Sequence, residues 1–260
     1  MVTGMDTFRR HFAGFEESFV IIGGAACDEW FTRLGGRFRV TRDIDMVLLL
    51  EAVQPRFFPQ LWAFIRSGGY EVGQRSDGER TFFRFVNPKQ RDYPKMIELL
   101  SNAPMTVELG HDQHIVPIPV GEDLSSLSAI LMNPNYYEFI MGQREVVDGL
   151  ALIKPAGLIV LKARAWLDLT RRRATGDTTV KEGDVSKHRS DVFRLTTILP
   201  TGESQELPEE LAKDLRDFLT AFPAAAPEWK AISQSLANSG IRMAASELLG
   251  ILRTFFKVTD

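Results

Sequence analysis

The stretch Phe19–Leu50 constrains the fold more than any other part of this chain, because two glycine pairs divide it into strand, helix and strand. Residues 19–22 are bulky and apolar, which is typical of a buried strand. Residues 25–34 have helical composition, and the glycine pair after them suits a helix end, since glycine readily adopts the left-handed conformation found there. Residues 39–50 are predicted to form the second strand. The pattern therefore predicts a strand–helix–strand unit.

Asp43 and Asp45 stand two residues apart at the start of the second strand. Alternate side chains of a strand share a face, so the two carboxylates project together. Mg²⁺ prefers oxygen ligands and often takes one or two carboxylates together with substrate phosphates. A helix that begins at Gly23 and Gly24 presents free backbone N–H groups to an anion. Together these features predict a nucleoside triphosphate site. The alternative, a solvated turn, leaves unexplained the apolar run directly after the aspartates.

A glycine pair, a helix and then Arg39, Thr41, Asp43 and Asp45 in an RxTxDID pattern stand in a specific order. This order resembles the DNA polymerase β-like nucleotidyltransferases, and more closely their AbiEii-like abortive-infection toxin branch. The match covers residues 21–98, with a weaker echo in the later helical part. The resemblance implies an α+β nucleotidyltransferase fold, in which helices flank a small mixed sheet, followed by a C-terminal helical domain.

The domain organisation follows from the change in pattern along the 260 residues. A chain of this length suffices for one large domain or two small ones. Residues 133–149 are rich in loop formers, and helical periodicity dominates after Pro155. We therefore predict a nucleotidyltransferase catalytic domain over residues 1–150 and a helical C-terminal domain over residues 151–260.

Glu98 is the candidate for a third metal-binding carboxylate. It interrupts the apolar segment 95–100, which is predicted to pair with residues 80–86 in a hairpin. A carboxylate in such a strand is costly to bury unless it is paired or bound to metal; an exposed edge glutamate is the alternative. The resemblance implies that Asp43, Asp45 and Glu98 hold two Mg²⁺ ions. Glu108 is a rival in a similar strand, and Glu98 is preferred because its hairpin partner is clear.

The nucleotide contacts are implied by the same resemblance. Gly23, Gly24 and Ala25 are expected to bind the triphosphate, although many relatives have serine where Ala25 stands. Arg39 and Thr41 are expected to contact phosphate or to support the carboxylates. A surface position at the strand edge is the alternative for Arg39.

A second group of candidates lies in the helical part. Lys187 and Asp191 are four residues apart on a predicted helix. The resemblance implies that a K-x-x-x-D pair faces the nucleotide, with Lys162 on the preceding helix as a further candidate. The alternative is a surface ion pair, which stabilises a helix by only a few tenths of a kcal/mol.

Composition and charge indicate which partners and which cellular location to expect. The chain has a net charge of −3, a single cysteine and no apolar run near the ~20 residues that span a bilayer, so we expect a cytoplasmic protein without a membrane partner. Residues 160–190 nevertheless carry eight basic and four acidic side chains. A phosphate-rich acceptor such as RNA is one interpretation of this excess, and a solvated helix end at residues 171–173 is the alternative.

The predicted activity is transfer of a nucleoside monophosphate from NTP to an acceptor hydroxyl. The resemblance implies RNA, above all tRNA, or a protein as acceptor, in a toxin or phage-defence role with an antitoxin partner. The alternatives are a small-molecule nucleotidyltransferase of the antibiotic-modifying kind and a catalytically silent nucleotide-binding module.

Overall fold

The computed structural model describes residues 2–49, 52, 54–74, 80–100, 106–109, 113–117, 130–131 and 133–259. The chain divides into two compact units, and each is described by itself. The first consists of Met1–Thr32, Arg39–Leu124 and Arg144–Ile153, and the second of Arg33–Phe38, Ser125–Gln143 and Lys154–Asp260. The domain division predicted at residue 150 remains a prediction.

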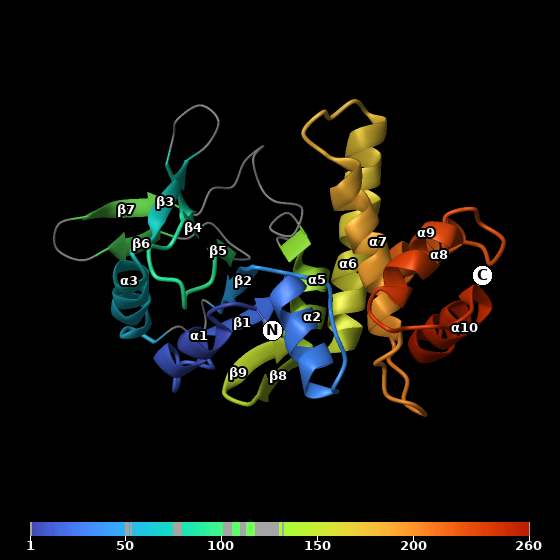
Figure 1. Cartoon of the computed structure of the whole chain (residues 1–260), viewed down its shortest axis with the longest axis horizontal. Coiled ribbons are helices and arrows are strands. Elements are labelled where there is room, and N and C mark those ends of the chain that lie inside the picture. The colour runs from blue at the N-terminus through green and yellow to red at the C-terminus, as the bar shows by residue number, and fades with distance from the viewer. Residues whose placement is uncertain are drawn as a thin grey trace. The chain divides into compact units, whose positions relative to one another are not determined.

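A seven-stranded mixed sheet forms the centre of the first unit (Figure 1). Its strand order is β3-β4-β5-β2-β1-β9-β8, with β2 parallel to β5, β1 parallel to β9 and the other pairs antiparallel. A separate two-stranded sheet contains β6 and β7. The predicted α+β class with a mixed sheet is confirmed. The strand bounds are Phe19–Ile22 (β1), Asp43–Leu48 (β2), Glu71–Gln74 (β3), Arg80–Val86 (β4), Met96–Leu100 (β5), Thr106–Leu109 (β6), Gln113–Pro117 (β7), Arg144–Val147 (β8) and Leu150–Ile153 (β9).

The first unit includes the helices α1 (Met5–His11), α2 (Gly23–Arg33) and α3 (Phe57–Gly68), and aromatic packing joins α1 and α3 to β1. Phe8 of α1 is fully buried, with its ring centroid 5.7 Å from that of Phe19 on β1 and 5.8 Å from that of Phe64 on α3. Edge-to-face contacts of this kind add to the stabilisation that comes from burying the rings. The cluster ties α1 and α3 to the strand that leads directly into α2.

The loop predicted over residues 133–149 is wrong. This segment contains α5 (Pro134–Gly142) and β8, and β8 and β9 form a hairpin. Asn133 caps α5, because its side chain accepts hydrogen bonds from two backbone N–H groups of the first turn. Asp148 and Gly149 have φ values of 49° and 75°, as a type I′ hairpin turn requires. The Asp-Gly dipeptide was the signal that could have revealed this hairpin.

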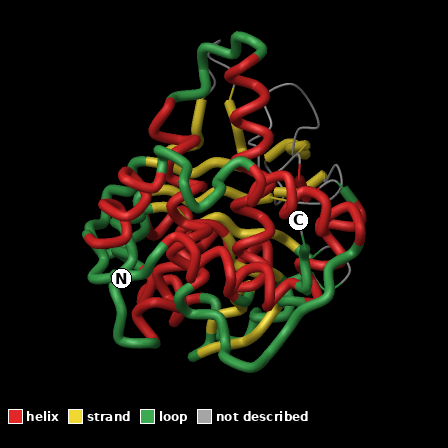
Figure 2. Tube along the Cα trace, turned by 90° about the vertical axis from the view of Figure 1, so that its right-hand side faces the viewer, coloured by secondary structure: helices red, strands yellow, loops and turns green. Residues whose placement is uncertain are grey.

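The second unit is helical and contains α5, α6, α7, α8, α9 and α10. The helices α6 and α7 are joined by a short loop and pack against each other along their length (Figure 2). Phe193 of α7 lies in a ring cluster with Phe218, Phe222 and Trp229, with centroid separations from 4.6 to 5.8 Å. The remaining bounds are Pro155–Ala174 (α6), Glu182–Thr196 (α7), Glu209–Thr220 (α8), Trp229–Ala237 (α9) and Ala245–Phe256 (α10).

The helix predicted over residues 187–199 starts earlier, at Glu182, and neither Asp184 nor Ser186 caps it. Asp184 instead lies inside the first turn, where a negative charge is favourable to the helix dipole. Within the described residues, no helix has the length and apolar character required to cross a bilayer.

Candidate functional site

Asp43 and Asp45 both lie on β2, which begins at Asp43 rather than at residue 39. Both aspartates are half-buried, whereas Ile44 and Met46 between and after them are fully buried. This alternation is what a strand dictates, with the two carboxylates on one face and the apolar side chains on the other. Residues 39–42 belong to no strand, so Arg39 and Thr41 lie in the segment that leads into β2.

Glu98 is brought next to the aspartates by strand pairing. On β5 it is the register partner of Asp45 in the parallel β2–β5 ladder, and it is 5% exposed. Glu108 lies on β6, in the separate two-stranded sheet, so its strand does not pair with β2. Of the two rivals, Glu98 is therefore the one that is adjacent to Asp45 in the sheet.

Arg84 is a member of the same row that the sequence analysis missed. It lies on β4 opposite Glu98, and its Nη2 donates to Glu98 Oε2 at 3.0 Å. The row across three strands thus reads Arg84, Glu98, Asp45. Counting the hairpin register outward from its Val86–Met96 pair would have placed Arg84 opposite Glu98.

The start of α2 lies against the carboxylate row. Gly23 has a φ of 67°, and a Cβ at this position would lie 1.9 Å from Asp45 Oδ2. A Cβ at Gly24 would lie 2.5 Å from the Thr41 hydroxyl oxygen. Only glycine at both positions allows Asp45 and Thr41 to approach the helix N-terminus this closely. The predicted glycine pair, threonine and aspartate are therefore brought together, with Ala25 buried in the first turn of the helix.

The carboxylates have the chemistry for a divalent cation, since Asp43, Asp45 and Glu98 offer the hard oxygen ligands that Mg²⁺ prefers. Nevertheless, among the described residues no three His, Cys, Asp or Glu side chains are close enough together to hold an ion. The sheet register makes the three neighbours, and the Glu98 side chain is bound to Arg84. Asp43 and Asp45 thus offer the donor type that Mg²⁺ prefers, while the Glu98 carboxylate is bound to Arg84.

The candidates in the second unit have different partners from those expected. Asp191 is fully buried; it accepts from Lys162 Nζ at 3.2 Å and from Arg194 Nη1 at 2.8 Å. Lys187 pairs with Asp184 at 2.8 Å, in a pair whose side chains are 40% and 44% exposed. The alternative of a surface ion pair between Lys187 and Asp191 is wrong, because Asp191 turns inward to the two buried cations. The nucleotide-facing role of the two residues remains a prediction.

The basic segment is partly neutralised within the α6–α7 hairpin. Arg172 pairs with Asp177 at 2.7 Å, and Arg173 pairs with Glu182. Arg171 is exposed and has no ion-pair partner among the described residues. Of the three successive arginines, Arg171 is the one best placed to meet an external anion.

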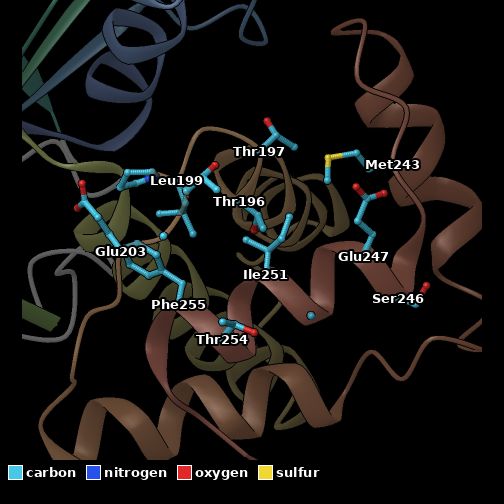
Figure 3. A pocket seen from close by; sticks show the side chains of 14 residues that line it. Thr196, Thr197, Leu199, Glu203, Met243, Ser246, Glu247, Ile251, Thr254 and Phe255 are labelled. Carbon is cyan, nitrogen blue, oxygen red and sulfur yellow. The ribbon is translucent and has the colours of Figure 1, made fainter.

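A cavity of about 410 Å³ opens elsewhere in the second unit, between the end of α7 and α10 (Figure 3). Hydroxyl groups and the carboxylates of Glu203 and Glu247 line it, and its described lining includes no basic side chain. A nucleotide phosphate would be repelled there. None of the predicted site residues contributes to this cavity.

No protein-family model and no curated protein matches the chain. A crystal structure of an antigenic nucleotidyltransferase-like protein from Paracoccidioides brasiliensis is similar, with 12% identity over 88% of this chain and 89% of that one, and a TM-score of 0.45. A solution structure of the antibiotic-resistance factor ANT(2'')-Ia is similar with 14% identity over 91% and 96%, and a TM-score of 0.37. Both TM-scores are below 0.5, so the function proposed below rests on the geometry of this chain. Membership of the AbiEii-like branch remains a prediction.

Proposed function

We propose that this chain is a metal-dependent nucleotidyltransferase that moves a nucleoside monophosphate from NTP to an acceptor hydroxyl. The observation that carries the proposal is the contact between Asp45 and Gly23, at the point where a strand bearing two carboxylates meets a helix N-terminus. A helix N-terminus favours phosphate, and paired carboxylates favour a divalent cation. A nucleoside triphosphate with its metal ion would place phosphate at the helix N-terminus and the cation at the carboxylates.

Asp43 and Asp45 would hold Mg²⁺, and Glu98 would join them as the third ligand. When bound, the ions lower the pKa of the attacking hydroxyl and stabilise the negative charge of the leaving pyrophosphate. The N–H groups at Gly23 and Gly24 would orient the phosphates.

The chemistry is a substitution at the α-phosphorus. The acceptor oxygen forms a bond to the α-phosphorus and releases its proton to solvent, while the bond from the α-phosphorus to the bridging oxygen breaks and pyrophosphate leaves. In such reactions catalysis consists mainly of positioning and of stabilising charge. The β2–β5 ladder, which sets Asp45 beside Glu98, would supply the positioning.

The proposed acceptor is RNA, above all tRNA, in a toxin or phage-defence role with an antitoxin as partner. The support is the local excess of positive charge over residues 160–190, because phosphate contacts by lysine and arginine supply most of the sequence-independent affinity for nucleic acid. Lys162, Lys187 and Asp191 remain proposals as nucleotide-facing residues, as does a cytoplasmic location.

The test is to incubate the protein with each labelled NTP, Mg²⁺ and total tRNA, and to measure transfer of label and release of pyrophosphate. Asp45→Asn is the matched control, since it keeps the shape of the side chain and removes its charge. Transfer that disappears in this variant and on removal of Mg²⁺ is expected.

Two other outcomes would redirect the assignment. Transfer to an aminoglycoside but not to RNA or protein would identify the small-molecule kind of nucleotidyltransferase. Tight NTP binding without turnover against any acceptor would identify a catalytically silent module.

A further inference from the structure

Arg84 is bound to the carboxylate that is the candidate third metal ligand, that of Glu98. Three acidic residues occupy neighbouring positions on β2 and β5, yet within the described part of the chain their side chains do not gather into a group of three. Glu98 is 5% exposed and directs Oε2 to the Arg84 guanidinium at 3.0 Å. A hydrogen bond between two charged groups restricts where the carboxylate lies.

Arg84 has a reason to be there that does not involve a bound ligand. A buried carboxylate is destabilised by desolvation, and its register neighbour Asp45 adds repulsion of like charges. The guanidinium offsets both. The side chain of Arg84 is 38% exposed while that of Glu98 is 7% exposed, so the arginine is the partner nearer to solvent.

We propose that Arg84 is a positioning residue that controls metal loading, by holding Glu98 until an ion takes it over. The inference rests on the proposed function, because it assumes that the aspartates and Glu98 bind a divalent cation. An arginine that holds Glu98 in this way weakens metal binding and stabilises the protein when no metal is bound. Loss of its charge should therefore have opposite effects on the two quantities.

The experiment compares Arg84→Met with the wild type, using Mn²⁺ alone as probe. Mn²⁺ affinity is measured by electron paramagnetic resonance and the melting temperature with and without Mn²⁺. Arg84→Met should melt at a lower temperature without metal, and should bind Mn²⁺ roughly tenfold more tightly, the order of effect expected for one nearby unit charge. Arg84→Lys keeps the charge and should bind Mn²⁺ as the wild type does.

The chain provides a matched control in Arg9, which pairs with Glu29 at 2.8 Å. The exposures resemble those of the Arg84 pair, at 26% and 10%, and neither residue lies on a strand of the carboxylate row. Arg9→Met should lower the melting temperature and leave the Mn²⁺ affinity unchanged. If the role of Arg84 is purely structural, Arg84→Met should behave as Arg9→Met does, with a lower melting temperature and an unchanged Mn²⁺ affinity.

The outcomes separate the two proposals. If the wild type binds Mn²⁺ and Arg84→Met binds it no more tightly, the inference about Arg84 is overturned and the nucleotidyltransferase proposal stands. If neither protein binds Mn²⁺, with or without NTP, the metal-dependent function and the inference fall together. Tighter binding in Arg84→Met alone supports both.

Discussion

At the scale of single residues, Gly23 has a backbone conformation that suits glycine and lies against the candidate metal ligand Asp45. Its φ of 67° is strained for any residue with a Cβ, and that Cβ would meet Asp45 Oδ2. Gly23→Ala should therefore lower the free energy of unfolding by about 2 kcal/mol or more, because left-handed strain and a clash with the carboxylate add together. Urea titration followed by circular dichroism measures it.

Gly250 is the control for this substitution. It lies inside α10, with no positive φ and open space where its Cβ would stand. Gly250→Ala should stabilise by roughly 0.5–1 kcal/mol, since alanine is the better helix former. Equal destabilisation by both substitutions would contradict the special position of Gly23.

Mutations of the two residues of the K-x-x-x-D pair should have very different effects on the free energy of unfolding. Asp191→Asn should cost about 3–5 kcal/mol, because Lys162 and Arg194 would remain buried with much less compensation. Lys187→Ala removes only a half-exposed ion pair with Asp184, so the free energy of unfolding should change by roughly 0.5 kcal/mol or less.

A loss of nucleotide transfer in Lys187→Ala would thus report on the site, whereas the same loss in Asp191→Asn would report on folding. Thermal unfolding of both variants beside the transfer assay makes the distinction. A large drop in the melting temperature of Lys187→Ala would show that the ion pair with Asp184 contributes more to stability than predicted here.

At the scale of elements, Asp177 fastens the turn between α6 and α7. It accepts from Thr179 and from the guanidinium of Arg172, and these bonds lower its pKa from the usual 3.8 to about 2. A lowered folded-state pKa stabilises above the unfolded value, and this contribution is lost as the pH falls through the folded value. The turn should therefore tighten with ionisation of Asp177 and loosen between about pH 4 and pH 2.

Amide hydrogen exchange at Thr179 measures this loosening. Asp177→Asn should lower the protection factor of the Thr179 amide at neutral pH, and this protection factor should change little on acidification. Exchange at Thr179 that follows the same pH dependence in both proteins would indicate that another group controls the turn.

Sequence patterns predicted some helices and strands correctly and missed others. The strand–helix–strand core and the hairpin bearing Glu98 were predictable, because apolar runs and glycine stops are local signals. The return of β8 and β9 to the sheet was not predicted, because their nearest central neighbour, β1, lies more than a hundred residues earlier in the chain. Arg84 and Arg194 were missed for a related reason: an ion pair depends on strand register or helix facing, and residue type alone does not reveal it.

At the scale of the whole molecule, charge is distributed unevenly although the net charge is −3. Residues 160–190 carry a local excess of four positive charges, from eight basic and four acidic side chains. Two of the three successive arginines are already engaged inside the hairpin. The surface available to a polyanion is therefore smaller than the sequence count implies, and any binding of RNA should depend on few side chains.

The last prediction follows from this reduced surface. If RNA is the acceptor, Arg171→Gln should weaken tRNA binding and reduce the slope of log affinity against log salt by about one, because one phosphate contact is lost. Arg173→Gln should have a smaller effect, since Arg173 already pairs with Glu182. Fluorescence anisotropy with labelled tRNA over a series of salt concentrations measures both, and NTP binding should be unchanged in both variants. Binding that does not respond to salt would exclude a phosphate-rich acceptor and direct the search to small-molecule hydroxyls, because the carboxylate row on β2 and β5 needs only an acceptor oxygen.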